Sequence, residues 1–467
     1  MFRKFIVYIS ILFTTIVFIG CATYYQKTIK FQEFVGSGNL EKADNYIEKD
    51  KKAKKQRNIL LYYMNRGTVN YMLKNHDVSI QLFSDAERTI EDYRKNFGAE
   101  ALSLVSNPTV KPYKAEDFEV VFVNYYLALN YLMQGKYESA LVEARRINMR
   151  LNELNDKYKD HKNRYQRDAF AHVIMGLIYD ATKNYNDAFI AYRNAVEVYE
   201  EDYKDNFNVV VPEQLKYDLL RTAYLTGFNE ELRYFEDKFN ITYQHEKHDG
   251  GDLVFIWHNG FGPVKSEWSI NFTTMPGNDG YLTIVNEEFG LNFQYYIGNR
   301  SDKAAFSQLD FLRIAFPKYV ERQPYWTDAE LIVKNTKLPL YEAQNINEIA
   351  FKTLHDRMVR EMANSLLRLA SKKAMEYAAT QENQNVGAVV SIANALTEKA
   401  DTRNWQTLPY AIHYTRAKLP VGENNITLKT YGGNYSESHD FTFNIEKAKT
   451  TFFTFQSLES KPIYNLY

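Results

Sequence analysis

The chain has 467 residues, of which 45% are hydrophobic and 25% are charged, and its formal net charge is −1. This is the composition of an ordinary soluble protein with a sizeable core. The nearly neutral charge excludes a nucleic-acid binder that works by bulk electrostatics, and the length predicts two or three domains. With 37 Tyr and 30 Phe, we expect aromatic packing between helices.

Residues 1–21 have the pattern of a secretory signal peptide. Residues 2–4 are Phe-Arg-Lys, and 5–19 form an apolar run. The run is too short to span a bilayer comfortably, since a spanning helix needs roughly 20 apolar residues. A basic start, a short apolar core and a small residue, here Gly20, are typical of a signal for export.

The end of this run resembles the lipobox of bacterial lipoproteins. Residues 17–21 are Val-Phe-Ile-Gly-Cys, and Cys21 is the only cysteine of the chain. The resemblance implies that the Cys21 thiol receives a diacylglycerol and becomes the new amino terminus. The alternative is a buried cysteine inside a simple membrane anchor. Either interpretation tethers the chain to a membrane, with its body facing away from the cytoplasm.

Residues 22–244 are predicted to form a tetratricopeptide-like helical array, because amphipathic helices alternate with short turns. Three units carry small and aromatic residues at the intervals of that repeat. We expect Gly176 to let the second helix pack closely and Tyr179 to fill the groove. The repeat-packing positions are Gly67 in one unit, Ala128, Tyr131 and Ala140 in the next, and Gly176, Tyr179, Ala188, Tyr192 and Ala195 in the clearest one. A weaker unit covers 219–235, and a partial one lies near 38–46.

Arrays of this kind stack into a curved surface that usually holds another protein or a peptide. We therefore expect an open groove along the helices, lined by Tyr and Asn side chains. The alternative is an array that only presents or braces the second domain.

Residues 245–467 are predicted to form an α+β domain with antiparallel strands. The helical period stops at the polar, glycine-rich segment 245–252. We expect strands within 253–336, helices within 346–401 and strands within 411–455, with a loop at 258–263. The terminal strands could pair with the early ones, and 432–434 reads as the turn of an antiparallel module. The whole chain is thus predicted to be multidomain, with an all-α domain followed by an α+β domain.

Three segments of this second domain resemble signatures of an uncharacterised bacterial lipoprotein family. One is NGFGPVK, with Gly260, Pro263 and Lys265, and another is RIAFPKY, with residues 315–317. The last is 400–428, which begins ADTRNWQTLP. The family-signature residues of the last segment are Asp401, Arg403, Trp405, Pro409 and Arg416. The resemblance implies a tetratricopeptide-like region joined to a mixed domain, a location in the cell envelope and no assigned activity.

The signature segment has two interpretations. Arg and Trp are favoured at the energetic centres of interfaces, so Arg403 and Trp405 could bind a partner. In the structural interpretation, which we favour, Asp401 pairs with Arg403 or Arg416, and Trp405 plugs the gap between the helices and the last sheet.

His245, His248 and Asp249 are the nearest approach to a metal site in the sequence. Two histidines three residues apart could share a zinc ion, with carboxylates completing the site. The segment is glycine-rich, however, and solvated histidines are common in such linkers, so we expect no metal and no cofactor.

The sequence has no G-x-S-x-G, H-E-x-x-H or G-x-x-x-x-G-K-[ST] motif. We therefore expect a lipid-anchored envelope protein that binds an envelope protein or peptide partner through its repeats, and not an enzyme. Residues 22–25 lack an early acidic run, which favours an outer-membrane anchor facing the periplasm. The alternatives are a regulator of a wall-building enzyme, or an enzyme acting on cell-wall or surface polysaccharide through two carboxylates at glycosidase separation.

Overall fold

A computed structural model describes residues 22–100, 111–156, 164–276, 281–288, 290–296, 311–358, 362, 366 and 400–463. The predicted signal peptide with Cys21 and most of the predicted helices between 359 and 401 lie outside these residues. Among the described helices, none combines the length and the apolar character needed to cross a membrane.

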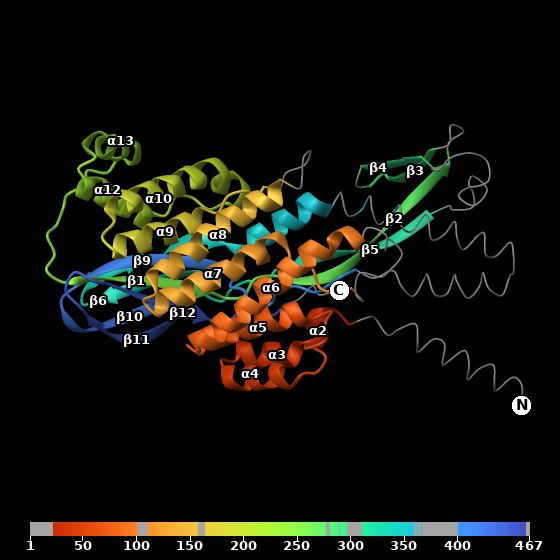
Figure 1. Ribbon diagram of the computed structural model, residues 1–467, viewed down its shortest axis with the longest axis horizontal. Coiled ribbons are helices and arrows are strands. Elements are labelled where there is room, and N and C mark those ends of the chain that lie inside the picture. The colour runs from red at the N-terminus through yellow and green to blue at the C-terminus, as the bar shows by residue number, and fades with distance from the viewer. Residues whose placement is uncertain are drawn as a thin grey trace, which may run out of the picture.

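Helices fill the first half of the described chain, as predicted (Figure 1). Consecutive helices pair as antiparallel hairpins, which include α5/α6, α7/α8, α9/α10 and α12/α13. The helices are α2 (Tyr24–Lys27), α3 (Ile29–Gly36), α4 (Leu40–Lys49), α5 (Ile59–Met72), α6 (His76–Glu100), α7 (Asp117–Met133), α8 (Tyr137–Asn155), α9 (Ala169–Ala181), α10 (Tyr185–Val198), the π-helix η2 (Tyr199–Tyr203), α11 (Lys204–Phe207), α12 (Glu213–Thr226) and α13 (Asn229–Phe239).

Local chemistry explains where the hairpins turn and how closely they pack. The Asp168 side chain caps α9 by accepting the Ala171 N–H at 2.6 Å, as helix starts favour. Within the α9/α10 hairpin, the ring of Tyr192 lies directly over Gly176 and leaves no room for a Cβ atom. The expectation that Tyr179 fills this groove is wrong. Tyr179 is half-buried and packs on the neighbouring hairpin, under the guanidinium of Arg145.

Strands dominate the second half of the described chain, where they form three four-stranded sheets. The first sheet has the order β12-β1-β9-β8, the second β11-β10-β6-β7 and the third β4-β3-β2-β5. The strands are β1 (Gly251–Asn259), β2 (Val264–Pro276), β3 (Tyr281–Asn286), β4 (Leu291–Tyr296), β5 (Phe311–Val320), β6 (Asp328–Val333), β7 (Thr336–Pro339), β8 (Tyr341–Asn345), β9 (Ala411–Leu419), β10 (Gly422–Gly432), β11 (Tyr435–Ile445) and β12 (Thr450–Ser457). A helix over 346–358 follows β8.

Two details of the predicted strands need correction. The predicted loop at 258–263 begins too early, because His258 and Asn259 still pair with β9 as the end of β1. The strands are also not all antiparallel, since β12 runs parallel to β1. The turn before β12 lies beside the start of β1, where the Asp252 N–H donates to the Lys449 carbonyl at 3.0 Å. β1 and β12 therefore start at the same end of the sheet. The predicted pairing of a terminal strand with an early one is confirmed.

The first sheet is the middle layer of the molecule, between the helices and the second sheet (Figure 1). Successive side chains of a strand point to opposite faces, and β1 is buried on both. Val254 and Ile256 belong to one core with the helices. Leu253, Phe255 and Trp257 belong to a second core with β6 and β10. The third sheet has its own small core, which includes Met362 and Leu366.

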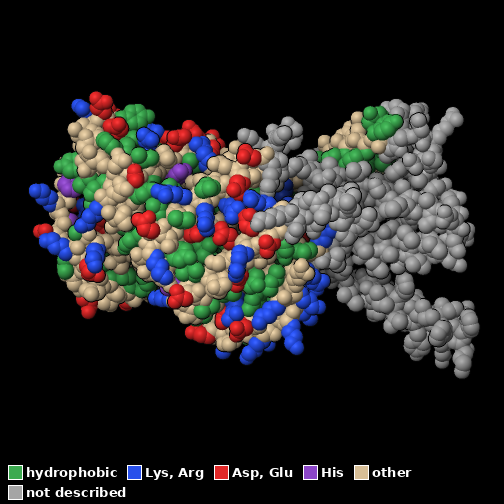
Figure 2. Space-filling view, viewed as in Figure 1, with side chains coloured by type: hydrophobic (Ala, Val, Ile, Leu, Met, Phe, Trp, Pro, Cys, Tyr) green, Lys and Arg blue, Asp and Glu red, His purple; other side chains and the backbone are tan. Residues whose placement is uncertain are grey.

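The outer face of the helices carries both acidic and basic side chains, which are interspersed (Figure 2). A shallow groove of about 550 Å³ separates α6 from α8. Its arginines pair with its carboxylates, for example Arg150 with Glu91 at 2.5 Å. This groove therefore presents little unpaired charge to a ligand.

Candidate functional site

The inner face of the helical array is covered by the first sheet. Tyr71 of α5 donates to Thr454 of β12 at 2.8 Å, and the Tyr125 hydroxyl of α7 lies 2.8 Å from Nε2 of His258 in β1. Tyr199 of η2 donates to a carbonyl of β8 at 2.6 Å. Along the described inner face, the expectation of an open groove lined by Tyr and Asn is therefore wrong. The sheet presents an apolar face, and the array buries its own apolar face against it.

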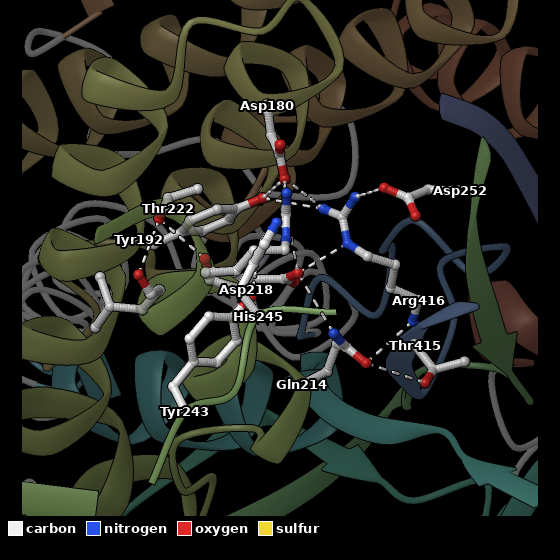
Figure 3. A network of polar contacts seen from close by, with 12 residues as sticks. Asp180, Tyr192, Gln214, Asp218, Thr222, Tyr243, His245, Asp252, Thr415 and Arg416 are labelled. Carbon is white, nitrogen blue, oxygen red and sulfur yellow. Dashed lines mark hydrogen bonds and ion pairs between the residues drawn. The ribbon is translucent and has the colours of Figure 1, made fainter. Parts of the chain in front are cut away.

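A buried arginine holds this junction together (Figure 3). Arg416 projects from β9 and reaches three carboxylates on three other elements. Its Nη2 lies 2.8 Å from Asp180 of α9, its Nε 2.8 Å from Asp218 of α12, and its Nη1 3.1 Å from Asp252 of β1. Arg416, Asp180 and Asp218 have side chains that are at most 4% exposed. We call these four residues, with Arg221, the Arg416 network.

The two most buried carboxylates of the network differ in their pKa values. Burial opposes ionisation of Asp180, but the guanidiniums of Arg416 and Arg221 outweigh it and lower the pKa below its usual value. For Asp218, burial outweighs both guanidiniums and raises the pKa. Oδ2 of Asp218 has no hydrogen-bond partner among the described residues. The network is thus a buried polar contact between the helices and the first sheet, in which guanidinium and carboxylate charges compensate each other.

The predicted metal candidates border this network but are not brought together. His245 and His248 line a polar cavity of about 280 Å³ beside Asp180 and Asp252, and Asp249 does not. The His245 ring stacks on Tyr224 with 4.6 Å between ring centres. Nε2 of His248 lies 2.9 Å from the Leu419 carbonyl, and Asp249 is fully exposed, 3.5 Å from Lys447. Across the described residues, no three His, Cys, Asp or Glu side chains are grouped to hold a metal ion.

Residues 400–410, the first part of the family-signature segment 400–428, lie largely in the interior. Asp401 pairs with Arg403 at 2.6 Å, and Arg416 belongs to the network described above. Arg403 also donates to the Arg57 carbonyl at 2.6 Å. The Trp405 indole donates to Thr68 of α5 at 3.1 Å. Arg403 is 6% exposed and Trp405 2% exposed, so neither offers a surface to another protein.

The other signature residues surround this segment. Lys265 is buried and forms an ion pair with Glu116. The Pro263 carbonyl accepts the Asn404 amide at 2.8 Å. Gly260 has a positive φ of 57° beside Pro324, and Pro409 is buried. These contacts join β1, β2 and the signature segment.

Two residues that the sequence did not single out are central to this junction. Glu119 accepts the Trp405 N–H at 2.6 Å and the Glu116 N–H at 3.0 Å. Burial, with the nearby charge of Glu116, raises the pKa of Glu119 to about 7. Arg322 donates to the Gly262 carbonyl at 2.6 Å. Glu119 could have been found, because Glu116 and Glu119 have the spacing of a capping box at the start of α7.

The predicted repeat positions pack the hairpins internally. Ala128, Ala140, Ala188 and Ala195 are fully buried, while Tyr131 is half-buried against the same core. A Cβ atom on Gly67 would approach the Phe83 ring to 2.9 Å. These positions leave no free binding groove between the paired helices.

A second cavity lies where α5 meets β11 and β12. Its volume is about 370 Å³, within the usual range for binding sites. Its walls are Leu40, Tyr71, Met72, Met133, Phe441, Phe453, Phe455 and Leu458, with Lys74, His76, His258, Thr454 and Gln456 as its polar residues. We call it the aromatic cavity. Lys74 is exposed at its rim, with Nζ 5.3 Å from the centre of the Phe453 ring.

The polar groups of the aromatic cavity are uncharged inside and cationic at the rim. Burial lowers the pKa of His258 to about 3, so the ring is neutral at physiological pH. The Gln456 carboxamide lies close enough to this ring to raise its pKa, against the larger effect of burial. Neither Nε2 nor Oε1 of Gln456 has a partner at normal hydrogen-bond geometry among the described residues. A buried amide without partners is unfavourable and would gain from a ligand.

Comparisons with known proteins supply no family. No protein-family model matches this chain, and no curated protein matches it. Solved structures that align with it include the apo form of RapI (16% identity, 49% of this chain and 58% of that one, TM-score 0.33) and MamA from Desulfovibrio magneticus RS-1 (13%, 44% and 88%, 0.29). A protein from Podosopora anserina with nearly identical TPR-like repeats also aligns (11%, 46% and 93%, 0.30). At these scores the likenesses carry no functional argument, and the lipoprotein-family resemblance stays a prediction.

Proposed function

We propose that this protein is a lipid-anchored binding scaffold of the cell envelope. In this proposal the helical hairpins brace the sheets, and the aromatic cavity receives part of a protein partner. The observation that carries the proposal is the aromatic cavity, because its apolar walls surround the unpaired carboxamide of Gln456. Ligand sites typically combine apolar walls with a few placed polar groups.

The chemistry of the cavity indicates which part of a partner fits. The walls favour one apolar side chain, and the Gln456 amide can both donate to and accept from a backbone peptide group. The ammonium group of Lys74 at the rim favours a carboxylate next to that side chain. We therefore propose a partner segment with an apolar residue beside an Asp, a Glu or a chain terminus.

The proposed location follows from the sequence. Lipid on Cys21 would hold the protein in the envelope, at an outer membrane and facing the periplasm. Enzymatic action on polysaccharide has less support. The lining of the aromatic cavity contains no carboxylate, and in the polar cavity Asp180 and Asp252 both pair with Arg416.

Photo-crosslinking in intact cells tests the binding site. We would place benzoylphenylalanine at Phe455 in the cavity and, as a control, at the exposed Tyr435 of β11. We expect the first position to capture one or two envelope proteins that the second does not. Lys74→Glu should weaken that capture, while Lys183→Glu should not. Lys183 is the matched control because both lysines have a positive φ after the first helix of a hairpin. Equal capture from both positions would refute the cavity as the binding site.

The anchor is tested separately by feeding cells an alkyne-bearing fatty acid. The native chain should take up the label, and Cys21→Ala should not. Label on both forms, or on neither, would refute lipidation of Cys21 and leave the cavity proposal untouched.

A further inference from the structure

A lysine-rich surface surrounds the start of α2, the first described helix of the chain. Residues 49–57 carry six Lys or Arg side chains and one carboxylate, Asp50, a formal charge of +5 in a chain whose total is −1. The patch consists of Lys27, Lys30, Lys49, Lys51, Lys52, Lys54 and Lys55, and all seven are exposed. We call it the lysine patch. Figure 2 shows basic side chains gathered at the lower edge of the described part, where Figure 1 draws α2 and α4.

The lysines of the patch are not neutralised by neighbouring carboxylates. In the described part of the chain, none of the seven forms an ion pair. Asp44 and Glu48 of α4 both pair with Arg66 at 2.8 Å. The Asp50 carboxylate accepts the Lys52 N–H at 2.7 Å. The patch therefore keeps its positive field.

Contacts around the signature segment bring the two parts of the patch together. The Tyr24 N–H donates to Thr402 at 2.9 Å, and the adjacent Arg403 donates to the Arg57 carbonyl. The start of α2 and the end of the lysine-rich loop are thus fixed on the same few residues.

The fold also begins very close to Cys21. Thr23 is buried and caps α2 through a capping box with Gln26. Only Ala22 separates this fixed residue from Cys21. Each extended residue spans at most about 3.6 Å, so a lipid on Cys21 would hold the start of α2 within roughly 10 Å of the headgroups.

We propose that the lysine patch rests on anionic lipid headgroups and fixes the orientation of the protein at the membrane. Clustered lysines next to a membrane anchor are attracted to anionic lipid, and this attraction falls off within a Debye length. The two acyl chains of a diacylglycerol on Cys21 would hold the chain at the membrane, and a basic patch adds a second contact that fixes the orientation of the body. The inference rests on the proposed membrane tether, and adds which face meets the membrane.

The test uses the full chain reconstituted in vesicles. Amine-reactive acetylation read by mass spectrometry would compare pure phosphatidylcholine vesicles with vesicles that also contain phosphatidylglycerol. We expect the patch lysines to react at least ~3-fold more slowly on anionic vesicles, and this protection to vanish in about 0.5 M salt. Lys136 and Lys334, on the α7–α8 and β6–β7 turns, are internal controls and should react equally on both.

A variant sharpens the result. This variant combines Lys51→Gln, Lys52→Gln, Lys54→Gln and Lys55→Gln. It should abolish the protection of Lys27 and Lys30, because the remaining positive charge would attract anionic lipid too weakly to keep this face at the membrane. Equal reactivity on both vesicles would overturn the proposal. Protection of the patch lysines that is the same on neutral vesicles, or that persists in high salt, would also overturn the proposal. Such protection would come from crowding by the tether and not from attraction to anionic lipid. The fatty-acid labelling described above reports lipidation of Cys21 separately, so failure of the vesicle test is distinguishable from failure of lipidation in cells.

Discussion

Nε of Arg416 lies 2.8 Å from Oδ1 of Asp218, and both side chains are buried where the last helical hairpin meets the first sheet. This ion pair joins residues 198 positions apart. With Asp180 and Asp252 it makes one guanidinium the meeting point of four elements, α9, α12, β1 and β9.

We therefore expect Arg416→Ala to lower the free energy of unfolding by ~3–5 kcal/mol, because it leaves the buried Asp180 and Asp218 with Arg221 as their remaining counter-ion. Urea unfolding followed by circular dichroism measures this difference. Arg88→Ala is the control, since Arg88 pairs with Asp85 on the surface and its side chain is 71% exposed. That change should cost no more than about 1 kcal/mol. Equal losses in the two variants would show that the buried network does not hold the layers together.

Gly176→Ala should destabilise the protein by ~1–3 kcal/mol, because the new methyl group would overlap the ring of Tyr192 inside a packed hairpin. The matched control is Gly36→Ala at the end of α3, where a Cβ atom would meet nothing within 4 Å. Its Tm should stay equal or rise slightly. If both variants melt like the native protein, the close packing of α9 on α10 is not what fixes this hairpin.

Glu119 should make the protein less stable as the pH rises. Its pKa is raised from the model-peptide value of 4.5 to about 7, first by burial and then by Glu116. The folded state therefore favours the protonated carboxyl. This contribution is complete below pH 4.5 and is lost between pH 4.5 and 7, a loss of about 3 kcal/mol. Glu119→Gln cannot titrate, so its stability relative to the native protein should increase across this window. A difference that stays flat with pH would contradict the assignment.

His258 should act in the opposite direction. Burial lowers its pKa from 6.5 to about 3, so the folded state favours the neutral ring. Its contribution is complete above pH 6.5 and is lost as the pH falls toward 3, by about 2 kcal/mol at pH 5. His258→Gln and His258→Phe should both gain stability relative to the native protein between pH 7 and 5. Their constant offsets will differ because only one keeps a polar group near Tyr125, but their pH slopes should agree. Unequal slopes would show that another group titrates.

The sequence predicts the helical hairpins well, because their signals are local. The pairs Gly67 with Phe83 and Gly176 with Tyr192 lie within one hairpin, at repeat spacing, and the structure places each pair in contact. Strands with alternating or continuous apolar residues, such as β1 and β10, are also found. The short strands β7 and β8 carry too few apolar residues to stand out.

What the sequence could not predict is which side chains of distant segments meet. Asp401 was an obvious partner for Arg416 by proximity in sequence, yet Arg416 pairs with Asp180 and Asp218 of the helical half. The sequence also did not predict that the sheet covers the inner face of the helices, and the reason is the same. Nothing in an amphipathic helix tells whether its apolar face will cover a partner or another part of the same chain.

The parallel pairing of β12 with β1 sets the order in which this protein can fold. Val254 meets Phe452 across 198 positions, a contact of very high sequence separation, and such contacts slow folding. The hairpins are made first, and part of their apolar inner face stays uncovered until the strands of the first sheet are in place. A partly folded chain therefore exposes apolar surface for a long time. If the chain is exported as we propose, we expect it to depend on a chaperone of the receiving compartment until β12 has paired with β1.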